Sequence, residues 1–566
     1  MPLRNEAFIK LAIFFVSVAI AAVYYTGLYC SDDTRYLMGA IRIAVGEQIS
    51  VESLAERRAV FILPASVVYA FTQSIDLSIA IYASFYAALA VVIYMLARRF
   101  FEAPAAFCTA LIGLSQPTLF LYSGALLPDI SAAYFLALSM LFLVRLSILR
   151  TGVELSGIGI LLGLACGSST AVAFAIKESS IVVAPIIATT LAVGLWRRRS
   201  VNGWAIPGAA LFGFSGVVLL EILLFKAVAG EWYSSFNSLL NPHDFTGFAD
   251  VQGTTFVSRL GSLYGQLGHY TALLFILAAA SSCKVIYDWS SGSLRAPNLG
   301  AWLVVIAFWA WPTFYFTFGT ASLTDYSFPV MQQRYYAPCV PPAALLAGRL
   351  LAPLLRASSA PIASRVLSTL AIVALVSAPI VKLPERGLIY GAAAKESFRA
   401  ALHIVSSEYP NVRVVDTDSG WTTDLNRCRI LLLSNVGTGR QRLMDTIRSG
   451  ADLDASFKYP DVRTLDAPFI LLGHGIVLDG SKGWVKSLEQ RVDSHDVRLE
   501  FLGHYDVSSC PAIQQYWFLP RSVAAQKCLE GGKASTLGRV KKSSPNSVSA
   551  YRVSGGDLQG DEEGRR

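Results

Sequence analysis

Long runs of apolar residues recur along the first two thirds of the chain, separated by short polar segments. A helix that crosses a membrane needs roughly 20 mostly apolar residues. The pattern therefore predicts a polytopic α-helical membrane protein with about 11 transmembrane helices. The predicted spans are residues 8–28, 77–97, 104–122, 129–149, 153–176, 179–196, 203–225, 266–283, 298–318, 336–355 and 363–383.

The chain between the first two predicted spans has a different pattern. In residues 29–60, apolar positions recur at helical spacing among charged residues, which predicts an amphipathic helix at the membrane surface. Residues 61–73 are apolar but too short to span, so we expect a second surface or re-entrant helix. Counting them as a span would move Arg98 and Arg99 to the side opposite the other loop arginines.

Charged residues in the loops orient the predicted spans. Short loops rich in Lys and Arg stay in the cytoplasm. The topology therefore places the N-terminus in the cytoplasm and the chain after residue 384 outside it. The basic residues on the predicted cytoplasmic side are Arg98, Arg99, Arg145, Arg150, Arg197 to Arg199, Lys284, Arg295, Arg349, Arg356 and Arg365.

A change of composition near residue 385 marks a second domain. Residues 1–385 form the predicted membrane domain, whose first outer loop covers 29–76. Residues 386–552 predict a soluble, extracytoplasmic α/β or α+β domain. Residues 553–566 are rich in Gly, Asp and Glu and predict a disordered tail. The predicted strands are 412–415, 429–433, 469–472, 497–502 and 516–519, and the predicted helices are 394–407 and 438–449.

Composition agrees with a membrane protein. Of the 566 residues, 54% are hydrophobic and 15% are charged, against about 25% charged in soluble proteins. The net charge of +8 would suggest a nucleic-acid partner for a soluble protein. Here the concentration of Lys and Arg in loops on one side of the membrane explains the net charge, so we expect membrane lipids and no nucleic acid as partners.

The eight cysteines include no C-x-x-C pair, and Cys510 and Cys528 could pair in an oxidising compartment.

Three carboxylates fall on the predicted outer face. Asp32 and Asp33 follow the first span, and Asp129 begins another. Each could be a helix cap, a role that Asp favours. A carboxylate can also take a proton from an acceptor during group transfer, or hold a divalent cation. A divalent metal at Asp32, Asp33 and Asp129 is therefore the one cofactor left open.

Cations fall on the same predicted face. Lys177 lies in a short turn between two spans, and Arg334 lies where the chain re-enters the bilayer. Lys177 could be a membrane-end lysine whose ammonium reaches water, and Arg334 could be an interfacial anchor. The planar guanidinium of Arg also matches phosphate, so a lipid-linked phosphate is a candidate ligand.

Several short motifs, taken together, resemble a known family. Asp32-Asp33-Thr34-Arg35-Tyr36 resembles the Asp-[Glu/Asp]-x-x-Tyr motif of GT-C glycosyltransferases, in particular the bacterial aminoarabinose transferases and protein mannosyltransferase-like enzymes. Pro128-Asp129 resembles their second outer acidic site. Ala175-Ile176-Lys177-Glu178 resembles their Lys-containing turn, and Gln333-Arg334-Tyr335-Tyr336-Ala337-Pro338 resembles their Arg-Tyr-x-x-Pro re-entry.

The resemblance covers residues 5–385 and implies a glycosyltransferase of the bacterial inner membrane. Such an enzyme would move a sugar from a polyprenyl-phosphate donor to a cell-envelope acceptor, which could be a glycan, a lipid or a protein. Asp32 would act as a base or orient the acceptor, with Asp33 and Asp129 as further catalytic carboxylates. The residues that would hold the donor phosphate are Lys177, Arg334, Tyr335 and Arg35.

Two other function classes stay open. A lipid or saccharide transporter or flippase would place ionisable groups near the bilayer midplane and often shows internal repeats. Here the charged groups gather at one predicted surface and no repeat is visible, which favours an enzyme. The third class is a receptor or assembly protein whose outer domain binds a glycan and whose membrane site is degenerate.

Overall fold

The structure is a computed structural model of the 566-residue chain. The residues it describes are 2–23, 25, 32–53, 55–148, 157–198, 204–240, 256–294, 296–319, 332–356, 376, 401, 405, 408–409, 412–416, 468–474, 497–505 and 548–555. The chain divides into two compact units, which we treat separately. The first is Met1–Ala22, Gln48–Pro64 and Ala80–Leu383, and the second is Val23–Glu47, Ala65–Ile79 and Pro384–Arg566.

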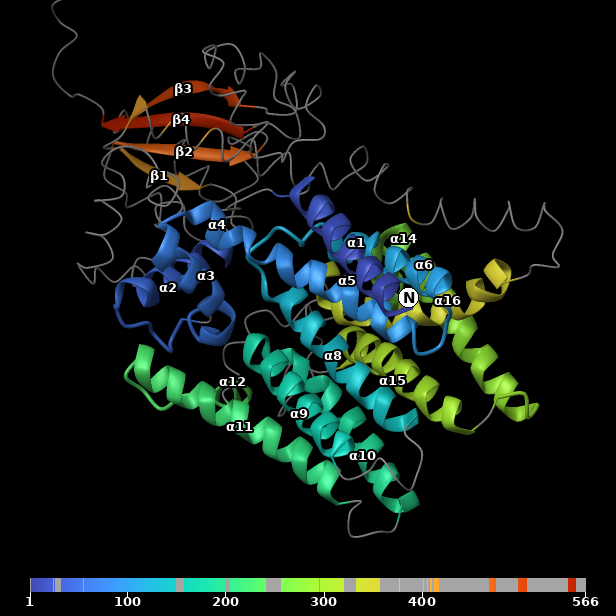
Figure 1. Ribbon diagram of the computed structural model, residues 1–566. Helices are drawn as coiled ribbons and strands as arrows, with labels where there is room; N and C mark the ends of the chain where they lie inside the picture. Colours follow the sequence, from blue (N-terminus) through green and yellow to red (C-terminus); the bar gives the residue numbers. More distant parts are fainter. Residues whose placement is uncertain are drawn as a thin grey trace, which may run out of the picture. The chain divides into compact units, whose positions relative to one another are not determined.

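Most described residues of the first unit lie in helices (Figure 1), of which α1 and α3 continue into the second unit after Ala22 and Pro64. They include two 3₁₀ helices, η1 and η3. Their bounds are α1 Pro2–Val23, α3 Ala59–Thr72, α5 Ala83–Ala97, α6 Ala103–Leu114, α7 Pro117–Phe120, α8 Pro128–Ile148, α9 Ile158–Ile176, η1 Glu178–Val183, α10 Ala184–Arg198, α11 Ala205–Val228, α12 Ser235–Leu240, α14 Phe256–Ser290, α15 Ala296–Phe318, η3 Gln333–Cys339 and α16 Val340–Arg356.

The prediction of a polytopic helical membrane protein is confirmed. Within the described residues, six helices are long and apolar enough to cross a membrane. The total of about 11 spans stays a prediction, and the span predicted at 363–383 lies almost wholly outside the described residues. The six are Ile75–Ala97, Pro128–Ile148, Ile158–Ile176, Ala205–Val228, Val257–Ser290 and Asn298–Phe318.

One predicted span is wrong as a continuous helix. Residues 104–122 divide into α6 and the single turn α7, with a break at Ser115 and Gln116. Gln116 has an extended backbone (φ −73°, ψ 130°) because the ring of Pro117 disfavours helical geometry in the residue before it. Residues 61–73 are confirmed as a helix too short to span, since α3 has 14 residues.

The helix α8 lies at the centre of the first unit. It packs against α5, α9 and α15 (Figure 1), and 14 of its 21 residues are buried. On α11, by contrast, side chains such as Leu211, Phe212 and Leu220 are exposed. A large exposed apolar face of this kind suits contact with lipid.

Glycines allow α9 and α11 to pack closely. A Cβ at Gly163 would lie 2.6 Å from the carbonyl oxygen of Ile206, and one at Gly167 would overlap the carbonyl oxygen of Ala210. Gly159, Gly163 and Gly167 follow one another at intervals of four residues, so they share one helix face. Any side chain there must push the two helices apart.

We expect Gly167→Ala to destabilise the protein by about 1–3 kcal/mol, because the added methyl group overpacks this contact. The measurement is the free energy of unfolding in detergent. The matched control is Gly216→Ala on α11, where an added Cβ meets nothing within 4 Å. It should be neutral or stabilise by up to about 1 kcal/mol, since Ala favours a helix. Equal effects of both variants would contradict the close-packing account.

Among its described residues, the second unit contains two further helices, the part of α3 after Pro64 and a four-stranded sheet. The helices are α2 Asp32–Val45, as predicted within 29–60, and α4 Ile75–Ala80, which ends one residue beyond the unit. The strand order is β1-β2-β4-β3, with β1 parallel to β2 and the other pairs antiparallel. The strands are β1 Arg413–Asp416, β2 Phe469–His474, β3 Val497–Tyr505 and β4 Val548–Gly555.

Three predicted strands, 412–415, 469–472 and 497–502, are confirmed within one or two residues at their starts. The fourth strand, β4, was not predicted, and the domain bounds, including the tail at 553–566, stay predictions. The alternating residues of β4 directly follow a polar segment, so the composition of this region does not reveal so short a strand. The strands predicted at 429–433 and 516–519, the helix predicted at 438–449 and the Cys510–Cys528 pair lie outside the described residues.

Candidate functional site

Asp129 and Lys177 form a buried ion pair between two of the candidate membrane spans. Asp129 lies in the first turn of α8, with 2% of its surface exposed. Lys177 follows the last residue of α9, and its Nζ atom contacts Oδ1 of Asp129. Each group therefore neutralises a charge that would be costly to bury alone.

The local sequence explains why both charges stand at helix ends. Pro128 begins α8, a position where its missing N–H costs no hydrogen bond. The positive end of the helix dipole then favours Asp129. The helix α9 ends at Ile176 because Lys177 has an extended backbone (φ −152°, ψ 114°), after which η1 begins.

The ring of Tyr335 lies within cation–π range of two cations. Its centroid is 4.1 Å from Nζ of Lys177 and 5.7 Å from Cζ of Arg334. The Nε atom of Arg334 donates to Oε1 of Gln332 at 2.8 Å. Burial raises the pKa of the Tyr335 hydroxyl, so this hydroxyl stays protonated at neutral pH and can donate a hydrogen bond.

A second ion pair adjoins the first. Nη2 of Arg58 lies 2.9 Å from Oε2 of Glu178, and the two side chains are 11% and 4% exposed. Glu178 follows Lys177 directly. Arg58 comes from the segment that precedes α3, and this segment is attached to α11 by the hydrogen bond from Ile49 N to Val228 O at 3.1 Å.

The cluster carries a net positive charge. Arg58, Lys177 and Arg334 contribute three positive charges, and Asp129 and Glu178 contribute two negative ones. Burial is the main cause that lowers the pKa of Lys177, to about 8; Asp129 opposes this shift, and Arg334 and Arg58 add to it. A site with surplus cations and a partly destabilised ammonium suits an anionic ligand.

A small cavity reaches this cluster. Its volume is about 10 Å³, roughly the space of one water molecule. A sugar phosphate could therefore enter only if side chains move. The cavity is lined by Asp129, Leu136, Lys177, Ser179, Ser180, Val182, Phe316, Tyr335 and Pro338.

Sequence reasoning missed two residues of the cluster. Arg58 is adjacent to Arg57, and nothing in the sequence says which of them would face Glu178. Tyr122 is close enough to Arg334 and Asp129 for both to affect its hydroxyl, and burial raises the pKa of that hydroxyl. Tyr122 was counted as the last residue of a predicted span, a position that gives no chemical signal.

The predicted site residues are divided between the two units. Asp129, Lys177, Arg334 and Tyr335 lie together in the first unit. Asp32, Asp33 and Arg35 stand at the beginning of α2, in the second unit, where Asp33 is 1% exposed. The two carboxylates lie in the first turn of α2, where negative charge also stabilises a helix. That α2 joins the cluster at Asp129 stays a prediction.

Metal ligation also stays a prediction. Within the described ranges, no group of three or more His, Cys, Asp or Glu side chains is placed to hold a metal ion. Asp129 is engaged by Lys177. A divalent ion would therefore depend on the approach of Asp32 and Asp33.

No protein-family model and no curated protein sequence matches the chain. Among solved structures, the archaeal oligosaccharyltransferase AglB of Archaeoglobus fulgidus, in complex with an inhibitory peptide and a dolichol-phosphate, is similar with a TM-score of 0.50 at 10% identity. The match covers 96% of this chain and 88% of AglB. ArnT from Cupriavidus metallidurans in the apo state is similar with a TM-score of 0.48 at 16% identity, over 84% of this chain and 94% of ArnT.

At these identities the likeness concerns the fold alone. The chain shares the GT-C fold with AglB, so the fold expected from the short motifs is confirmed. The charges of the candidate site stand at the ends of α8 and α9.

Proposed function

We propose that the chain is a membrane glycosyltransferase that moves a sugar from a polyprenyl-phosphate donor to an extracytoplasmic acceptor of the cell envelope. The observation that carries the proposal is the cluster of Arg58, Lys177 and Arg334 around Tyr335. It gathers surplus positive charge at the ends of membrane helices, where the phosphate of a lipid would lie. The fold supports it further, since AglB was solved with a dolichol-phosphate.

The chemistry follows from the charges. An oxygen of the acceptor attacks the anomeric carbon, and the bond from that carbon to the phosphate oxygen breaks. The electron pair leaves with the polyprenyl phosphate, whose negative charge Lys177, Arg334 and Arg58 stabilise. The acceptor's proton goes to a carboxylate. Asp129 is already paired with Lys177, so we assign the base to Asp32 and the positioning of Lys177 to Asp129.

The topology belongs to the same proposal. From the loop charges we infer that the cluster and the second domain lie outside the cytoplasm, with the N-terminus inside. The proposed membrane is a bacterial inner membrane. The acceptor could then be a glycan, a lipid or a protein of the envelope.

The experiment that tests this function compares two strains. Deletion of the gene should remove one sugar from an envelope component, which mass spectrometry of glycans, lipids and proteins would identify. The purified chain should then transfer that sugar from its polyprenyl-phosphate carrier to the stripped component. Lipid movement across vesicles without sugar transfer would favour a flippase instead.

The pH dependence of donor use follows from Lys177. Because an ammonium is charged below its pKa, and that pKa is about 8, kcat/KM for the donor should be constant from about pH 5, where carboxylates are ionised, to about pH 7. Above about pH 8 it should fall up to tenfold per pH unit. Lys177→Arg keeps its charge and should abolish this fall. An unchanged fall in that variant would exclude Lys177 as its source.

A further inference from the structure

Two arginines, Arg99 and Arg145, lie at the C-terminal ends of α5 and α8. Asp129 lies at the other end of α8. Arg145 lies in the last turn of α8, 16 residues and about 24 Å along the helix from Asp129. Arg99 follows α5, which packs against α8. The neighbouring Arg98 is already engaged, since it donates to Oε1 of Glu6 at 2.6 Å and to the Phe101 carbonyl at 2.7 Å.

Within the part of the chain that the structure describes, Arg99 and Arg145 have no such partners. The Nε atom of Arg145 is buried and has no hydrogen-bond partner among the described residues. Arg99 lies close enough to repel it electrostatically. A buried donor without a partner and two adjacent like charges both cost free energy. An anion between the two guanidinium groups would remove both costs.

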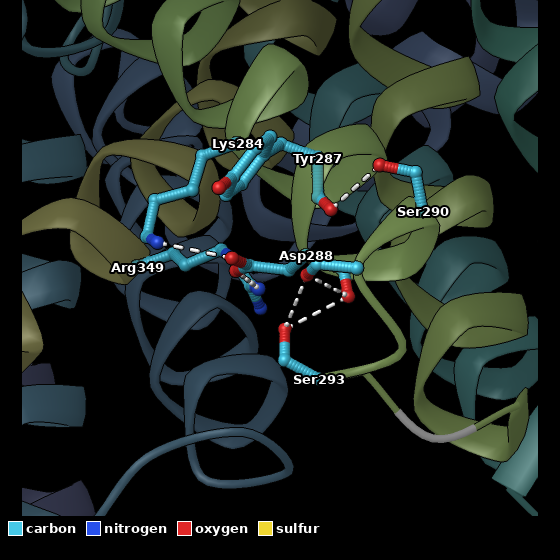
Figure 2. Close-up of polar contacts among 7 residues, drawn as sticks. Lys284, Tyr287, Asp288, Ser290, Ser293 and Arg349 are labelled. Atoms are coloured by element: carbon cyan, nitrogen blue, oxygen red, sulfur yellow. Dashed lines mark hydrogen bonds and ion pairs between the residues drawn. The ribbon is translucent and has the colours of Figure 1, made fainter.

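Another charged group at this end is neutralised within the chain (Figure 2). Asp288 accepts from Nη2 of Arg349 at 2.6 Å and from Nζ of Lys284 at 3.1 Å, while Ser293 donates to its backbone carbonyl at 2.8 Å. Here each cation has a carboxylate from this chain. Arg99 and Arg145 have none among the described residues.

The two groups are joined by aromatic residues. The ring of Trp302 on α15 lies 4.9 Å from Cζ of Arg349 and 4.1 Å from the ring of Phe100, the residue after Arg99. Phe100 follows Arg99 in the turn after α5. Tryptophan with arginine is typical of the headgroup level of a bilayer. The Arg99–Arg145 pair therefore lies where a lipid headgroup can reach it.

We propose that Arg99 and Arg145 bind the phosphate of an anionic phospholipid headgroup, at the membrane face opposite the proposed donor site. Guanidinium groups match phosphate oxygens in geometry and charge. The negative ends of the α5 and α8 dipoles explain why each helix ends in a cation. The helix dipoles do not explain why Arg99 and Arg145 lie near each other, or why the buried Nε atom of Arg145 has no acceptor among the described residues. An inorganic phosphate would satisfy the same chemistry.

The test uses the full-length protein in lipid nanodiscs. Its Tm is measured in phosphatidylcholine alone and with added phosphatidylglycerol. We expect phosphatidylglycerol to raise the Tm by a few degrees, because a ligand that binds only the folded state stabilises it. The double variant Arg99→Gln/Arg145→Gln should lose most of this gain. Lys10→Gln, which removes one positive charge on α1, should keep it.

The other outcomes are equally informative. Inorganic phosphate that raised the Tm in phosphatidylcholine, and only with both arginines present, would support the phosphate site and assign it a soluble ligand. The same phosphatidylglycerol gain in wild type and in the double variant would overturn the proposal. Should the double variant fail to fold, Arg99→Gln alone is used, because Arg99 is exposed in a turn; it should lose at least half of the gain.

Discussion

Replacing Asp32 with Asn is expected to lower kcat for sugar transfer about 10²- to 10⁴-fold, with KM for the donor nearly unchanged. Asparagine has the shape of aspartate but cannot accept the acceptor's proton, and loss of general-base catalysis has an effect of this size. The measurement is steady-state transfer from the polyprenyl-phosphate donor. Asp33→Asn should cost less, because the proposed base is Asp32.

The structure supplies a matched control for Asp32. Asp76 also lies in the first turn of a helix, α4, and in the same unit. Removing its charge costs the same helix-dipole stabilisation, about 0.3–1 kcal/mol. Asp76→Asn should therefore reproduce any structural effect and keep full transfer activity. If both variants lost activity equally, Asp32 would be a helix-stabilising residue and no base.

Removing the ammonium of Lys177 is expected to lower kcat/KM for the donor about 10²- to 10³-fold, the usual loss when one group that stabilises a developing anion is deleted. Lys177→Met also leaves Asp129 as a buried, unpaired carboxylate. We therefore expect it to destabilise the protein by about 3–5 kcal/mol. Activity and the free energy of unfolding are measured together.

A double variant separates stability from chemistry. Asp129→Asn/Lys177→Met removes both charges of the buried pair, so most of the stability should return. The transfer activity should not, because no cation replaces the ammonium beside Tyr335. A double variant that was stable and as active as wild type would show that the pair is structural.

Only some residues of the cluster could be identified as candidates from the sequence alone. Lys177 and Asp129 are visible because each stands where a long apolar run begins or ends. Their contact needed the structure, since the sequence does not say which helix ends meet. Arg58 was hidden for a related reason, because its partner Glu178 is 120 residues away in the chain. A charged residue in a polar segment gives no sign of its partner.

For the fold as well, the local sequence marks where helices begin and end but not which helices pack together. The span over α8 was predicted within a residue, because Pro128 and a long apolar run mark it. Pro117 favours the helix break at Gln116, but the apolar run continues across it and therefore predicted one continuous span. The spacing of Gly159, Gly163 and Gly167 is visible in the sequence, whereas their partner helix α11 is not.

The most direct test of the account is the binding of undecaprenyl phosphate to the purified protein, measured as a Kd for wild type and for Asp129→Asn/Lys177→Met. Undecaprenol, which has the same chain without the phosphate, is the matched ligand. We expect the variant to bind undecaprenyl phosphate about 10- to 100-fold more weakly than wild type, the loss expected for hydrogen bonds to a charged group. It should bind undecaprenol as wild type does. Equal affinity of wild type and variant for undecaprenyl phosphate would contradict the claim that this cluster receives the donor.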